Sequence, residues 1–170
     1  MTGAPPGLST ARPARAEPII RIPSIGMGVR VRIAAAWGAD LPVVVETTNA
    51  AGFGPPLHRW ERSEIFEVVT GRFLFEVDGR RFIARRGDLV SVPGGAARAF
   101  VNVTGTGARQ KVIIQPGTDA AAFFRELAAA MAAEPPRRCA MLRLFGRRWG
   151  VDYLGAPLDA GEGASQDGGP

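Results

Sequence analysis

The sequence predicts an all-β domain, a small barrel of two packed sheets, followed by two helices. Short apolar or alternating runs recur between turn signals from residue 29 to residue 116, and an Asp-Gly pair separates two of them. After Pro116 the apolar residues change to helical spacing. The length of 170 residues, with 46% hydrophobic and 22% charged residues, fits one domain with a sizeable core.

The barrel region is expected to contain a series of short strands with regular spacing, which is typical of sandwiches and barrels. The expected strands are residues 29–36, 43–48, 65–70, 72–77, 81–84, 89–92, 99–103 and 110–115. Asp78 and Gly79 predict a tight hairpin, because Asp-Gly suits a two-residue type I′ turn whose twist matches paired strands.

Two helices are expected after the barrel. The first covers residues 120–133, with Thr118 or Asp119 as its cap and two prolines as its stop. The second covers roughly residues 137–148 and ends at Gly150. The first helix places one apolar stripe on one face, formed by Phe123, Leu127 and Ala130.

The domain is expected to span residues 19–158, with the barrel at about 25–116 and the helices at about 119–148. Residues 1–18 lack an apolar core of signal-peptide length, so we expect a disordered lead. Residues 159–170 are rich in Gly, Asp and Ser, so we expect a disordered tail. No apolar run approaches the roughly 20 residues that span a bilayer. A cytoplasmic protein without a membrane partner is therefore expected.

The basic character of the chain does not predict a nucleic-acid partner. The net charge is +5, but the basic residues are scattered, Lys111 is the only lysine, and no nucleic-acid-binding motif accompanies them. The densest set lies on the second helix and is interpreted as a solvated face: Arg137, Arg138, Arg143, Arg147 and Arg148. The single cysteine, Cys139, is expected to be a small buried hydrophobe.

Two segments of the barrel region carry glycine, proline and polar residues at characteristic separations. The first segment contains Gly52, His58, Trp60, Glu64 and Gly71. The second contains Gly87, Pro93, Gly95, Arg98 and Asn102.

In order and spacing these segments resemble the two signature motifs of the cupin superfamily, most closely the small single-domain cupins related to quercetin dioxygenases. The resemblance covers about residues 25–158 and implies a cupin β-barrel, also called a double-stranded β-helix or jelly roll, with C-terminal helices. It also implies degenerate metal-ligand positions. Trp60 and Arg98 stand where the motifs carry histidines, so His58 and Glu64 are the only expected ligands left.

The resemblance and strand alternation together predict a pocket inside the barrel. His58 and Trp60 share one strand parity, as do Glu64 and Phe66, and by the family pattern these side chains point inward. The predicted catalytic residues are His58 and Glu64. The predicted pocket or ligand-binding residues are Trp60, Phe66, Arg98 and Phe100.

No metal cofactor is expected, because a mononuclear Fe, Mn, Ni or Zn site generally needs three or four N or O ligands. Trp60 cannot ligate, and Arg98 stays protonated. The guanidinium of Arg98 is instead expected to pair with Glu64 and to stack on Trp60. The alternative is a divalent metal held by His58, Glu64 and ligands not yet identified.

Three functions remain open from the sequence. The preferred one is a metal-free barrel that holds a small organic molecule, anionic ones included, as a binding protein or as a cyclase or isomerase. The second is a metal-dependent dioxygenase or isomerase of the quercetin dioxygenase-like kind. The third is a non-catalytic pseudoenzyme or interaction module whose barrel is filled by its own side chains. A homodimer is a further expectation, since cupins often pair through sheet edges.

Overall fold

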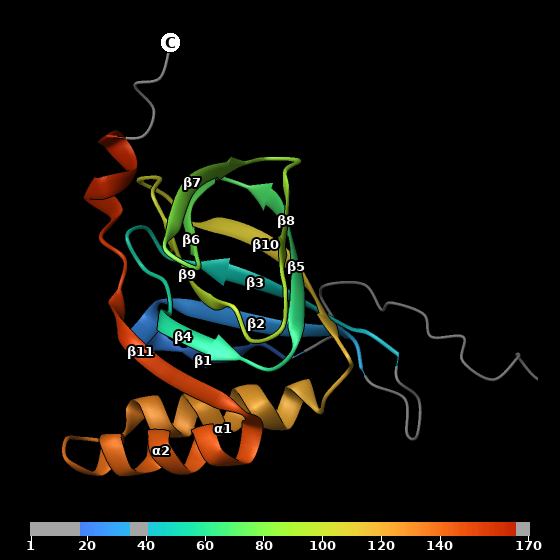
Figure 1. Ribbon diagram of the computed structural model, residues 1–170, viewed down its shortest axis with the longest axis vertical. Helices are drawn as coiled ribbons and strands as arrows, with labels where there is room; N and C mark the ends of the chain where they lie inside the picture. Colours follow the sequence, from blue (N-terminus) through green and yellow to red (C-terminus); the bar gives the residue numbers. More distant parts are fainter. Residues whose placement is uncertain (1–17, 35–40, 166–170) are drawn as a thin grey trace, which may run out of the picture.

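Two antiparallel sheets face each other in the computed structural model, which describes residues 18–34 and 41–165 (Figure 1). One sheet has the order β1 (Ile20–Ile22), β2 (Met27–Ile33), β3 (Val43–Asn49), β10 (Ala108–Gln115), β5 (Ser63–Thr70) and β8 (Leu89–Val92). The other has the order β11 (Val151–Pro157), β4 (Pro56–Trp60), β9 (Ala97–Asn102), β6 (Arg72–Val77) and β7 (Arg80–Arg85). A 3-10 turn, η1 (Pro23–Ile25), joins β1 to β2.

Alternation of apolar and polar side chains sets the inner face of the barrel. Along β10 the residues Ala108, Gln110, Val112 and Ile114 are buried, while residues 109, 111 and 115 are exposed. The predicted hairpin is confirmed: Asp78 and Gly79 both have positive φ, at 46° and 78°, and β6 pairs with β7 across them.

The predicted strands are present, with boundaries that differ by one or two residues where both ends are described. The strand predicted over residues 29–36 begins earlier, at Met27, and its last two residues lie outside the described ranges. Three strands were not predicted by periodicity alone: β1, β4 and β11. They are short or border proline, so they carry little alternation of their own.

Four glycines of the two motifs adopt left-handed backbone conformations, with φ of 78° at Gly52, 86° at Gly71, 90° at Gly87 and 83° at Gly95. Each lies in a connection between strands, where a Cβ would be strained. The motif glycines therefore fix the turns of the barrel.

The two predicted helices are confirmed, and both lie beneath the barrel next to β1, β2 and β4 (Figure 1). Helix α1 (Ala120–Ala132) begins where the carboxylate of Asp119 accepts a hydrogen bond from the Ala122 amide at 3.0 Å. Helix α2 (Arg137–Trp149) ends at Gly150, which has φ of 69°. The apolar stripe of α1 is buried as expected.

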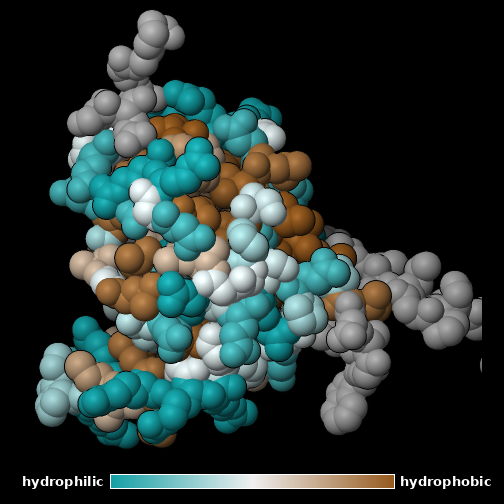
Figure 2. Space-filling view, in the orientation of Figure 1, coloured by the Kyte–Doolittle hydropathy of each residue, from teal (hydrophilic) through white to brown (hydrophobic). Residues whose placement is uncertain are grey.

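Cys139 is exposed, so the prediction that it is buried was wrong. Helix α2 buries only Phe145, and its other apolar positions stay at least partly open to solvent. Four of the five α2 arginines are exposed, and Figure 2 shows a hydrophilic surface over this helix. No helix among the described residues is long and apolar enough to cross a membrane.

The chain beyond residue 158 departs from the expected tail. A 3-10 helix, η2 (Ala160–Ser165), forms there, and the Asp159 carboxylate accepts a hydrogen bond from the Gly161 amide at 2.8 Å. Glu162 pairs with Arg81 on β7, which attaches η2 to the barrel. Folded structure thus continues past residue 158 because local side chains cap this turn. Of the expected lead, residues 1–17 lie outside the described residues, as do residues 166–170 of the expected tail.

Candidate functional site

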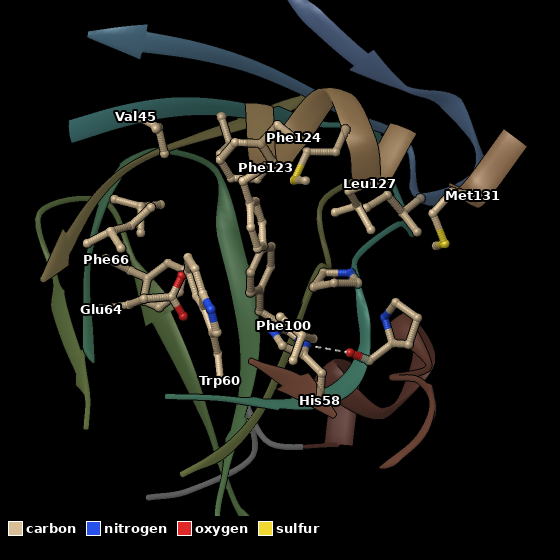
Figure 3. Close-up of a pocket in the computed structure, with 18 of the residues that line it drawn as sticks. Val45, His58, Trp60, Glu64, Phe66, Phe100, Phe123, Phe124, Leu127 and Met131 are labelled. Carbon is tan, nitrogen blue, oxygen red and sulfur yellow. Dashed lines mark hydrogen bonds between the residues drawn. The ribbon is translucent and has the colours of Figure 1, made fainter. Parts of the chain in front are cut away.

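A cavity of about 70 Å³ lies inside the barrel, at the end that α1 covers (Figure 3). Its wall is mainly apolar. Helix α1 contributes Phe123, Phe124, Leu127 and Met131. The rest of the chain contributes the apolar residues Ile25, Met27, Val45, Pro55, Pro56, Trp60, Phe66, Phe100, Val112, Ile114 and Val151. The polar lining residues are Thr47, His58, Glu64 and Tyr153.

Aromatic rings fill the half of the barrel that lies away from α1. Phe66 meets Phe75 edge-on at 5.3 Å between centroids and Phe100 at 5.5 Å, while Phe73 meets Phe100 at 6.0 Å. Phe73 and Phe75 are almost completely buried and do not line the cavity. Phe66 and Phe100 therefore form its inner boundary, as the sequence predicted for these two residues.

Trp60 fastens the helices to the barrel. Its ring stacks on Phe123 of α1 at 4.6 Å between centroids, and its Nε1 donates a hydrogen bond to the Trp149 carbonyl at 2.9 Å. Trp60 also lines the cavity, which confirms its predicted place. Its expected stacking partner was Arg98, but the ring instead packs on a helix whose position the motif could not predict.

Glu64 and Arg98 form a buried ion pair, with Nε of Arg98 3.1 Å from Oε2 of Glu64. The predicted pairing is confirmed. Arg98 is only 2% exposed, and its other guanidinium nitrogens donate to the carbonyls of Trp60, Arg62 and Pro93 at 3.2, 2.9 and 3.2 Å. These bonds place the cation behind Glu64, outside the cavity lining. Arg98, predicted as a pocket residue, is therefore not among the described residues that line this cavity.

Burial raises the pKa of Glu64 from 4.5 to about 7, and the charge of Arg98 acts in the opposite direction. Near neutral pH this carboxyl can hold or release a proton. Burial also lowers the pKa of Arg98, while Glu64 and Asp78 raise it.

His58 lies on β4 and lines the cavity, so its predicted inward orientation is confirmed. Its Nδ1 lies 2.8 Å from the Pro56 carbonyl, the contact drawn dashed in Figure 3. Because a carbonyl only accepts, Nδ1 carries the proton of the neutral ring and Nε2 is left as an acceptor. Burial lowers the pKa of His58 from 6.5 to about 4, opposed by the Pro56 hydrogen bond, and Arg98 lowers it further. The ring is therefore neutral at pH 7.

Several lining residues were not identified from the sequence. Thr47 follows Val43 and Val45 at alternating positions on β3, so its inward orientation could have been inferred. Tyr153 on β11 lies beside His58, with ring centroids 6.5 Å apart, and burial raises its pKa. Phe123 was assigned to the apolar stripe of α1, but periodicity does not tell which surface that stripe covers.

The site residues do not fit a mononuclear metal centre. His58 and Glu64 are the only donors of the expected set, and the Glu64 carboxylate already faces the Arg98 cation at 3.1 Å. A cation so close to a ligating oxygen opposes a divalent ion. No group of three or more His, Cys, Asp or Glu side chains within residues 18–34 and 41–165 is placed to hold a metal.

Residues 44–114 match the family model described as Cupin domain. They run from β3 to β10 and include both motif segments. No curated protein matches the sequence. The match and the two-sheet topology confirm the predicted cupin β-barrel with C-terminal helices and support the cupin superfamily, without singling out the quercetin dioxygenase-like subgroup.

Three solved structures with similar folds are an RmlC-like cupin from Shewanella frigidimarina, KdgF from Halomonas sp. and the polyketide cyclase RemF from Streptomyces resistomycificus. The first two are 19% and 17% identical, with TM-scores of 0.57 and 0.58, and each match covers 66% of this chain and 96% or 97% of the other. RemF is 18% identical, with a TM-score of 0.55, and the match covers 75% of this chain and all of the other. At this identity the likeness shows the fold alone.

Breaking the buried ion pair should cost more than breaking an exposed one. Arg98→Met should destabilise the protein by on the order of 3 kcal/mol, because it leaves a buried carboxylate and three carbonyls without their donor. Glu64→Gln should cost less, since Arg98 keeps its carbonyl partners. Urea denaturation of both single variants and the double variant gives the coupling energy, expected to exceed about 1 kcal/mol.

The exposed pair of Lys111 and Glu67, at 3.4 Å, supplies the matched control cycle. Its coupling energy should stay below about 1 kcal/mol. If the losses at Arg98 and Glu64 are additive, so that their coupling energy is no larger than that of the surface pair, the buried ion pair is contradicted.

The pKa values of His58 and Glu64 have opposite effects on stability as pH changes. Because folding raises the pKa of Glu64, the stability that this carboxyl contributes is lost as pH rises from 4.5 to about 7. Because folding lowers the pKa of His58, the stability that this ring contributes is lost as pH falls from 6.5 to about 4. Relative to the wild type, Glu64→Gln should therefore gain stability with rising pH, and His58→Gln should lose it. Unfolding free energies measured from pH 4 to pH 7.5 check this, and profiles parallel to the wild type would contradict it.

Proposed function

From the premise that the chain folds as a cupin barrel, we propose that it binds a small, neutral, mainly apolar organic molecule without a resident metal. The observation that carries this proposal is the cavity under α1, with its apolar wall and few polar groups. Ligand sites are commonly of this kind, apolar with a few placed polar groups.

The charges around the cavity favour a neutral ligand over an anionic one. No Lys or Arg of the described chain lines the cavity, and the nearby cation, Arg98, is already bound to Glu64 and to three carbonyls. Besides Thr47 and Tyr153, the polar lining residues are neutral His58, whose Nε2 is an acceptor, and Glu64, whose carboxyl is near its midpoint of titration at pH 7. A bound anion would meet that carboxyl inside the cavity, while the cation paired with it, Arg98, lies outside the lining.

The size of the cavity limits the ligand to a few heavy atoms as the side chains stand. An apolar cavity of about 150 Å³ in another protein accommodates benzene, and this one is smaller. A larger molecule requires the α1 side chains at the boundary, Phe123 and Met131 among them, to move.

A second candidate function is an isomerisation or cyclisation by proton transfer, which the position and pKa of Glu64 favour. A general acid or base works best with a pKa near the working pH, and Glu64 has that pKa in the wall of a mainly apolar cavity. His58, with a pKa of about 4, is suited to accepting a hydrogen bond rather than to taking a proton at pH 7. The donor set does not favour a metal-dependent dioxygenase.

Ligand entry can be followed through the methionine methyl groups of the intact protein. Met27 and Met131 line the cavity, whereas Met141 lies on α2 outside it. Addition of cyclobutanone or methylenecyclobutane to protein labelled with ¹³C-methyl methionine should shift the Met27 and Met131 signals and leave Met141 unchanged.

Met141 serves as the internal control for non-specific effects of the added solvent. A variant with a filled cavity, Val112→Phe, should reduce the shifts at Met27 and Met131. If neither probe moves these signals up to its solubility limit, the barrel is closed by its own side chains and the proposed function is wrong.

A further inference from the structure

Gln110 on β10 is completely buried, yet neither its amide oxygen nor its amide nitrogen has a hydrogen-bond partner in the described structure. Native proteins rarely leave a buried side-chain amide without partners, because the lost water contacts are costly. Such a group calls for a partner that the described residues do not supply.

Gln110 lies next to residues that line the cavity, although it is not itself one of the lining residues. In the sheet it stands opposite Thr47 of β3, which lines the cavity, and Val112, two residues along β10 on the same face, lines it as well. Opposite residues of an antiparallel pair have Cβ atoms roughly 5 Å apart, so the Gln110 side chain lies directly beside that of Thr47.

Asn49 is the second buried amide next to residues that line the cavity. It is 1% exposed, lies two residues from Thr47 on the inner face of β3, and pairs across the sheet with Met27, another lining residue. The Thr47 hydroxyl donates to Oδ1 of Asn49 at 3.1 Å. Nδ2 of Asn49 has no hydrogen-bond partner among the residues described.

The free groups in this cluster are mainly donors. Gln110 offers one NH₂ and one carbonyl, and Asn49 offers a further NH₂ because Thr47 occupies its oxygen. We propose that Gln110 and Asn49 form a polar subsite at the β3–β10 side of the cavity, oriented by Thr47, and that it binds the carbonyl oxygen of the ligand. This proposal rests on the proposed function and adds the chemical class, a neutral ketone, aldehyde or amide.

The alternative occupant is a trapped water molecule, which the same groups would hold. The isosteric pair cyclobutanone and methylenecyclobutane separates the two, because the probes differ only in C=O against C=CH₂. A ligand carbonyl at the subsite gives the ketone an advantage that depends on Gln110, whereas a permanently held water does not.

The test compares the affinity ratio of ketone to hydrocarbon, from titration of the Met27 and Met131 methyl signals, between the wild type and Gln110→Met. Methionine keeps the length of the side chain and removes its hydrogen-bonding groups. The ratio should fall by about tenfold in the variant, the value of one lost hydrogen bond to a buried group. Gln115→Met, on the exposed end of the same strand, is the matched control and should leave the ratio unchanged.

A measurement on the wild type covers the case in which Gln110→Met does not fold. Cyclobutanone should shift the Gln110 side-chain ¹⁵NH₂ signals, and methylenecyclobutane should not. An unchanged ratio in Gln110→Met, or Gln110 signals that respond equally to both probes, would overturn the subsite while ligand entry itself stands. Methyl signals that respond to neither probe would instead overturn the proposed function.

Discussion

The guanidinium of Arg98 lies where three strand ends and the Glu64 carboxylate meet, and the candidate site depends on that position. Its nitrogens hold the carbonyls of Trp60 at the end of β4, Arg62 in the next turn and Pro93 after β8. The same cation offsets part of the cost of burying Glu64. One side chain thus joins the turns of both motifs and lowers the pKa of Glu64, against the larger upward effect of burial.

Trp60 stands at the other motif position that departs from histidine, and there it makes a structural contact. By stacking on Phe123 and bonding the Trp149 carbonyl, it holds both helices against the open end of the barrel. The phenylalanines of the inner half close the opposite end. What is left is a small apolar space with Glu64 and His58 in its wall. Beside it lie two buried amides, Gln110 and Asn49, whose NH₂ groups have no partner among the described residues. Trp60 and Arg98 therefore act together: Trp60 holds the two helices against the barrel, and Arg98 pairs with the Glu64 carboxylate from outside the cavity.

Much of the fold could be predicted from the sequence, because turn chemistry and alternation are local. Asp78 and Gly79, the cap at Asp119 and the stop at Gly150 each act within a few residues. The inward orientation of His58, Glu64 and Phe100 followed from strand parity once the motif fixed the face. The position of Arg98 relative to the cavity could not be predicted in this way, since it depends on carbonyls from three separate segments. The exposure of Cys139 depends on how α2 packs against the rest of the domain. The unpartnered amide groups of Gln110 and Asn49 can be identified only when their cross-strand neighbours are known.

We propose that Arg98 holds the Glu64 carboxylate in place of a metal ion. Calorimetric titration of Ni²⁺ into the wild type and into the double variant Trp60→His with Arg98→His, checked for folding by circular dichroism, tests it most directly. We expect no stoichiometric uptake by the wild type, and uptake of one equivalent by the variant, which offers three imidazoles and a free carboxylate. Binding of one equivalent by the wild type, lost on Glu64→Gln, would contradict it.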